Sequence, residues 1–154
     1  MKKKKTPKQS ETIMTEIVYP NDTNPMGILQ GGRMVHWMDT AAAICAQNHA
    51  ENICVTASID SVKFKAPARV GNIVTIKAKV TRSFHSSMEI LVEAWSKEVI
   101  TQEVQLINEA YFTFVAINSL AKPTNVPVLV PGNQLEKEQF EFAEIRKKHR
   151  ITQK

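Results

Sequence analysis

Two features near residue 30 have the residue types that hydrolytic chemistry needs. The first is Asp39, which follows a segment broken by Gly and Pro and lies where the sequence is typical of a helix, from about Arg33 onward. Successive residues of a helix are rotated by about 100° around its axis, and on this basis Asp39 lies outside the polar stripe of the helix, among small or apolar neighbours. A carboxylate there is costly to bury unless it is paired, so Asp39 is the first candidate for acid-base or nucleophilic chemistry. The alternative is a structural aspartate, exposed or bonded to backbone donors. The polar stripe consists of Arg33, His36, Thr40 and Gln47.

The second feature is the Gly31-Gly32 pair at the start of this helix. Glycines leave the first N–H groups of a helix uncovered, and a helix N-terminus carries partial positive charge. Such an end can stabilise an anion or a developing oxyanion, although an ordinary glycine-rich turn is the alternative. At a rise of about 1.5 Å per residue, Gly32 and Asp39 are roughly 10 Å apart along the axis. If both take part in catalysis, they serve different copies of the site, which indicates a dimer.

Other catalytic signatures are absent from the sequence. There is no Gly-x-Ser-x-Gly elbow, no phosphate-binding loop and no dinucleotide glycine pattern. His36 and His49 are not at metal-ligand spacing and have no Glu or Cys companion, so we expect no metal site and no cofactor. The candidates that remain are Asn24, Asp39 and the glycine pair.

The elements that must position these residues are one long helix and about five strands. Alternation predicts a strand over 73–82, with Val74, Ile76, Ala78 and Val80 on its buried face. The helix is apolar over most of its circumference, so the sheet must curve around it, which gives an α+β fold with a mostly antiparallel sheet. The other predicted strands cover 12–19, 54–65, 88–97 and 104–118; the central helix ends near His49, and a C-terminal helix covers 135–150.

The 154 residues fit one domain, and the net charge of +5 comes from the two ends of the chain. We expect a disordered basic tail over 1–11, a single domain over 12–133, and a charged helix with a basic tail over 134–154. Without the ends, the body from Gln9 to Ile145 has ten basic and 15 acidic residues, which argues against a nucleic-acid partner. No apolar run has membrane-spanning length, and Cys45 and Cys54 do not suggest a disulfide framework, so we expect a cytoplasmic protein.

The segment Asp-Thr-Asn-Pro-Met-Gly-Ile-Leu-Gln-Gly-Gly, followed after six residues by Asp-Thr-Ala-Ala-Ala-Ile and then by Val-Thr-Ala-Ser-Ile-Asp-Ser-Val-Lys-Phe, resembles the hotdog-fold acyl-CoA thioesterases. The similarity covers about residues 14–150 and is greatest to the acyl-CoA hydrolases of the brain-type family and their single-domain relatives. It implies a central helix wrapped by an antiparallel sheet, with two protomers joining their sheets and two active sites at the seam. The functional Asn and Asp of the family match Asn24 and Asp39. The resemblance therefore implies a homodimer as the minimal unit, and assembly into a trimer of dimers is common in the family.

The reaction that this resemblance implies is hydrolysis of acyl-CoA to a fatty acid and CoA, with coenzyme A as part of the substrate. Asp39 would act as general base for water, or as nucleophile. Asn24 would orient the water or the substrate, and the N–H groups near Gly31 and Gly32 would polarise the thioester carbonyl. The residues that resemble the CoA-nucleotide contacts are Arg82, His85, Ser86 and Ser87. Gln30 and Arg33 depart from the family pattern and leave the acyl-chain length open.

Three other hypotheses compete with hydrolysis. A hotdog protein can bind acyl-CoA as a regulator without hydrolysing it, although the presence of both Asn24 and Asp39 argues against this. A hotdog dehydratase needs a catalytic histidine near the helix start, and the sequence offers only His36, without the expected context. A nucleic-acid module would depend on the basic tails alone.

Overall fold

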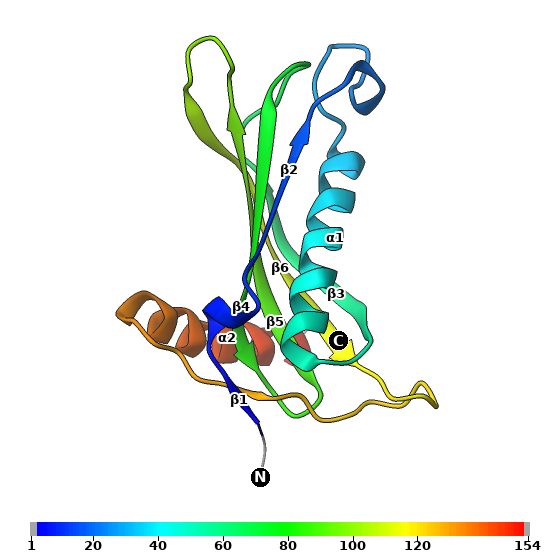
Figure 1. The fold of residues 1–154 in the computed structure, drawn as a ribbon, viewed down its shortest axis with the longest axis vertical. Helices are drawn as coiled ribbons and strands as arrows, with labels where there is room; N and C mark the ends of the chain where they lie inside the picture. Colours follow the sequence, from blue (N-terminus) through cyan, green and yellow to red (C-terminus); the bar gives the residue numbers. More distant parts are fainter. Residues whose placement is uncertain (1–2, 153–154) are drawn as a thin grey trace.

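The computed structural model describes residues 3–152, and its main feature is a five-stranded antiparallel sheet (Figure 1). The strands lie in the order β2-β4-β5-β6-β3. Each begins and ends within two residues of the strand that the sequence predicts, because the alternation and the Gly- and Pro-rich connections mark the ends clearly. Their bounds are β2 Thr12–Ile17, β3 Cys54–Phe64, β4 Ile73–Ser83, β5 Ser87–Lys97 and β6 Val104–Ala116.

The central helix α1, Gly31–Ala50, lies along one face of this sheet (Figure 1). Alternate residues of the strands point toward it, and those of β4 are at most 1% exposed, as the alternation predicts. Alanine at 41, 42 and 46 of the helix allows the strands to approach its backbone closely. The core between helix and sheet contains Met34, Trp37, Met38, Val74, Ile76, Met88, Ile90, Phe112 and Phe114.

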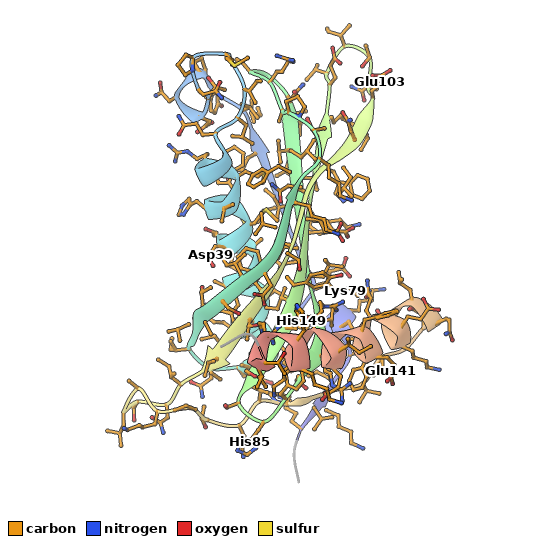
Figure 2. All side chains as sticks on the ribbon, turned by 180° about the vertical axis from the view of Figure 1, so that it is seen from behind. Asp39, Lys79, His85, Glu103, Glu141 and His149 are labelled. Atoms are coloured by element: carbon orange, nitrogen blue, oxygen red, sulfur yellow. The ribbon has the colours of Figure 1, made fainter. Side chains whose placement is uncertain are left out.

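The C-terminal helix α2, Gln134–Thr152, lies across the opposite face of the sheet (Figures 1 and 2). Glu89 of β5 points toward α2, because its neighbours in the strand point toward α1. Its carboxylate is fully buried and accepts hydrogen bonds of 2.9 and 2.7 Å from the guanidinium of Arg146 and 2.6 Å from the hydroxyl of Thr81. Arg150 pairs with Asp60 of β3 at 3.2 Å.

The structure confirms the predicted C-terminal helix, but two of its basic residues are not part of a free tail in solvent. Arg146 and Arg150 lie within a helix and pair with carboxylates of the sheet. A buried carboxylate is unfavourable without such partners, which explains why these charges are held in place. Lys154 lies outside the described residues.

The prediction of a disordered tail over residues 1–11 is wrong for residues 3–11. Lys4–Lys5 form strand β1, which pairs in parallel with β7, Val128–Leu129. The amino groups of Lys3 and Lys5 lie 2.5 and 2.8 Å from the carboxylate of Glu51 and lower its pKa to about 2. Backbone pairing and ion pairs thus order a segment whose composition alone suggests solvation. Pro7 and Ser10, farther along this segment, are buried.

Strand β3 forms one border of the sheet. It pairs with β6 along one edge, and the other edge has no strand partner among residues 3–152. Three large apolar side chains of this strand are more than a third exposed, namely Val55, Ile59 and Phe64. An unpaired edge with exposed apolar side chains is a surface suited to association with another strand.

Candidate active site

Asp39 lies on α1 at about the middle of the helix and is half-buried (Figure 2). Its Oδ1 atom accepts a hydrogen bond of 2.8 Å from the hydroxyl of Thr56 on β3. Its Oδ2 atom has no hydrogen-bond partner within residues 3–152. The carboxylate is thus bonded to a side chain at the open edge of the sheet and not to backbone donors.

Asn24 lies in the loop before α1 and is exposed. Its side-chain Oδ1 accepts hydrogen bonds from the backbone N–H of Met26 at 2.9 Å and of Ile28 at 3.2 Å. Backbone N–H groups can only donate, so the atom that faces them must be the amide oxygen of Asn24. The Nδ2 amino group therefore points away from the turn. The turn thereby holds Asn24 as a hydrogen-bond donor toward the outside.

The start of α1 has no side-chain cap. The side chain of Gln30, the N-cap residue, donates to the carbonyl of Thr23 at 3.0 Å, and the first helical hydrogen bond runs from Met34 N to Gln30 O. The backbone N–H groups of Gly31 and Gly32 consequently have no acceptor among the described residues. Two uncovered donors at the N-terminus of a 20-residue helix suit a developing oxyanion.

A pocket of about 340 Å³ adjoins this helix start. Gly31 forms part of its wall, and a Cβ atom at that position would lie 3.3 Å from the ring of Phe64. The pocket also borders the Asn24 turn, because Ile28 belongs to both. Asp39 lies outside the lining. The remaining lining residues are Leu29, Met34, Lys65, Ala66, Pro67, Ala68, Ile107 and Asn108.

The residues expected at the CoA nucleotide lie at the connection between β4 and β5. Arg82 donates to the carbonyl of Phe140 at 3.1 Å and stacks on its ring, with the guanidinium carbon 4.0 Å from the ring centroid. His85 is exposed at the end of this hairpin, whereas Ser86 and Ser87 are half-buried. Figure 2 shows His85 at one end of the molecule, well below Asp39.

One chain therefore brings together only part of the expected site. Asn24, Gly31 and Gly32 lie together before and at the start of α1, and Asp39 lies two turns farther along the helix. The β5 end of the hairpin that carries Arg82 and His85 lies two strands away from Thr56, because Met88 and Thr56 both pair with Phe114 of β6. Thr56, the partner of Asp39, was missed by the sequence analysis because its nearness to Asp39 requires β3 to pack beside α1. The signal that could have identified Thr56 is its position in the Val-Thr-Ala-Ser-Ile-Asp motif, which is part of the family resemblance.

The described residues contain no group of three or more His, Cys, Asp or Glu side chains arranged to hold a metal ion. None of the helices in residues 3–152 has the length and apolar character needed to cross a membrane. The arrangement that the structure does show is a carboxylate, an amide donor and an uncovered helix start.

Comparisons with known proteins give a consistent family assignment. The model of the thioesterase superfamily matches residues 26–102, half of the chain. The chain is 39% identical over 144 residues to a Mus musculus acetyl-coenzyme A thioesterase, and the match covers 92% of this chain. The chain spans about a quarter of the length of that relative.

Solved structures match over nearly the whole chain. A hexameric acyl-CoA thioesterase superposes with a TM-score of 0.95 and 38% identity, covering 98% of this chain and 97% of that one. An acyl-CoA hydrolase from Staphylococcus aureus, solved with butyryl-CoA and CoA, superposes with a TM-score of 0.91 and 34% identity, covering 97% and 92%.

The Staphylococcus aureus enzyme has also been solved as three alanine variants, at an aspartate, an asparagine and a threonine. The intervals between those three positions equal the intervals between Asn24, Asp39 and Thr56 in this chain. The family model, the structural matches over nearly the whole chain and the arrangement of helix and sheet agree. The chain therefore belongs to the thioesterase superfamily and has the hotdog fold.

Proposed function

We propose that this protein is an acyl-CoA thioesterase that hydrolyses acyl-CoA to a free fatty acid and CoA. The observation that carries the proposal is the half-buried carboxylate of Asp39, held by Thr56 through Oδ1 with Oδ2 free. Such a group is oriented and has an oxygen left to accept a proton from water.

Each polar group has a role that its geometry supports. Asp39 takes a proton from water as the water oxygen bonds to the thioester carbon, and the negative charge moves to the carbonyl oxygen. The N–H groups of Gly31 and Gly32 and the amide of Asn24 are the donors for that oxygen or for the substrate. The carbon–sulfur bond then breaks, and the CoA thiolate takes the proton back from Asp39.

Direct attack by the Asp39 carboxylate is the second route. It would form an acyl-aspartate anhydride that water then cleaves. Single turnover in ¹⁸O-labelled water identifies the nucleophilic route when water cleaves the anhydride at Cγ of Asp39, because the label then enters Asp39. A general base never places the label in Asp39.

We further propose that the working unit is a homodimer in which each site combines Asn24 and the helix start of one chain with Asp39 of the other. The separation of these groups within one chain supports this arrangement, and so does the unpaired, apolar border strand β3 that carries Thr56. Two of the solved neighbours are described as hexameric, a state that three such dimers would give.

The CoA nucleotide is assigned to Arg82, His85, Ser86 and Ser87, whose basic and hydroxyl groups suit phosphates. We propose that this hairpin serves the site of a neighbouring chain, since in the same chain His85 lies at one end of the molecule, below Asp39 (Figure 2). A cytoplasmic location is proposed as well, and the two buried, unpaired cysteines fit it.

The test is release of free CoA thiol from acyl-CoAs of increasing chain length. We expect turnover by the wild type, and a loss of roughly a hundredfold or more in kcat for Asp39→Asn if it is the base. Asn24→Ala is the second variant, and both must keep the wild-type mass in solution. Binding of acyl-CoA without any turnover by the wild type would replace this proposal with a non-catalytic, acyl-CoA-binding role.

A further inference from the structure

Asn108 of β6 is buried without a hydrogen-bond partner at either end of its amide. It is 1% exposed, and both Oδ1 and Nδ2 lack a partner. Ser10, His49 and Thr113 each have one such buried atom, so within residues 3–152 Asn108 is the residue with two. A buried, unpaired amide destabilises the fold, and its presence calls for a partner that arrives from outside the chain.

The surroundings of Asn108 form the wall of a pocket. It lies opposite Phe64 in the β3–β6 ladder and lines the pocket at the start of α1, together with Gly31 and Met34. The rest of the lining is largely apolar, so Asn108 contributes a polar amide to a pocket shaped for hydrocarbon. Gly31, one of the two glycines with an uncovered N–H group, lines the same pocket, which places the pocket beside the proposed oxyanion donors.

We propose that Asn108 is a specificity-determining residue that pairs with a hydroxyl group on a short acyl chain. This inference rests on the proposed function, because it assigns the pocket to the acyl group of the thioester. A hydroxyl satisfies both ends of the amide, since it donates to Oδ1 and accepts from Nδ2–H. A plain alkyl chain satisfies neither end, and a carbonyl oxygen satisfies only Nδ2. The substrate class is therefore a hydroxyacyl-CoA whose chain fits a pocket of about 340 Å³.

The experiment compares kcat/KM for butyryl-CoA, acetoacetyl-CoA and each enantiomer of 3-hydroxybutyryl-CoA. We expect the wild type to prefer one hydroxy enantiomer over butyryl-CoA by about tenfold or more, with acetoacetyl-CoA between them. In Asn108→Leu, a change of similar volume, this ratio should fall to near one. Met34→Leu is the matched control, because it alters the apolar lining of the same pocket and should keep the wild-type ratio.

A stability measurement separates recognition from a structural role. Asn108→Leu should melt at or above the wild-type temperature, because the change removes two unpaired polar atoms. A lower melting temperature together with equal losses on all substrates would show that the amide has a structural partner and would overturn the inference. Equal wild-type kcat/KM for butyryl- and 3-hydroxybutyryl-CoA would also overturn it.

The same substrates distinguish failure of this inference from failure of the hydrolase proposal. Turnover of butyryl-CoA tests hydrolysis, whereas the ratio between substrates tests Asn108. If no thioester is hydrolysed, calorimetric binding of butyryl-CoA and 3-hydroxybutyryl-CoA to wild type and Asn108→Leu provides the same ratio. A wild-type binding preference that the variant lacks would support the assignment, and equal binding by the wild type would refute it.

Discussion

The hydroxyl of Thr56 donates a 2.8 Å hydrogen bond to Oδ1 of Asp39 and so joins the border strand of the sheet to the central helix. The two residues are 17 positions apart in the sequence. Because Thr56 lies on the strand whose outer edge is unpaired, any chain that adds to this edge also comes close to Asp39. The predictions below start from this relationship.

Thr56→Val should lower kcat/KM by roughly ten- to a hundredfold, because a hydrogen bond to a charged group contributes about 1.5–3 kcal/mol. We expect most of the loss in kcat, since Thr56 orients Asp39 and is assigned no contact with CoA. Steady-state CoA release measures both parameters. Thr56→Ser retains the hydroxyl and should recover most of the activity; equal losses in the two variants would contradict an orienting role.

Mixing inactive variants tests whether the active site is shared between chains. When Asn24→Ala and Asp39→Asn chains are unfolded together and refolded, a site built from two chains gives mixed dimers with one intact site. At random pairing this restores about a quarter of the wild-type activity. A site contained within one chain restores none. The control is refolding of each variant alone, which should stay inactive.

Arg146→Met should destabilise the protein by about 3–5 kcal/mol, because it removes both guanidinium hydrogen bonds from the fully buried carboxylate of Glu89. The hydroxyl of Thr81 and the more distant guanidinium of Arg150, at 4.0 Å, are the partners that stay. Urea unfolding measures the loss. Lys148→Met, at an exposed position of the same helix, is the control and should change stability by less than about 0.5 kcal/mol.

The double variant Glu89→Leu/Arg146→Met removes both charges at once. Replacing a buried ion pair by apolar residues is often close to neutral, so the double variant should be more stable than Arg146→Met alone. If the two single losses simply add, the pair is not coupled, and this account of how α2 is held to the sheet is wrong.

His49 makes stability depend on pH. Burial lowers its pKa from the ordinary value of 6.5, against an opposing hydrogen bond to the carbonyl of Pro127. Below pH 6.5 the unfolded chain binds a proton that the folded chain does not, so stability falls as pH decreases toward the lowered pKa, by at most about 1.4 kcal/mol per pH unit.

Urea unfolding between pH 7.5 and pH 5 measures this slope. His49→Gln should reduce it, whereas His36→Gln, at an exposed position of the same helix, should retain it. A slope that is unchanged in His49→Gln would assign the pH dependence to other groups.

Most of the secondary structure follows from local sequence. The alternation of Val74, Ile76, Ala78 and Val80 with polar residues predicts which face of β4 is buried, because side chains of a strand point alternately to opposite faces. The glycine pair and the run without Gly or Pro predict where α1 begins, because these residues act on the backbone locally. Asn24 and Asp39 could be named from residue types and spacing, with the family resemblance.

Contacts between distant segments required the tertiary structure. The pairing of Lys4–Lys5 with Val128–Leu129 and the burial of Glu89 beneath Arg146 arise from packing, and local composition indicates the opposite. The amide of Asn108 stays unpaired only because of what surrounds it in the fold. By itself, therefore, the sequence determined the elements and the candidate residues, because propensity and periodicity act over a few positions. The tertiary structure alone decided the partners of Asp39, Glu89 and Asn108, because hydrogen bonding and burial depend on segments far apart in the chain.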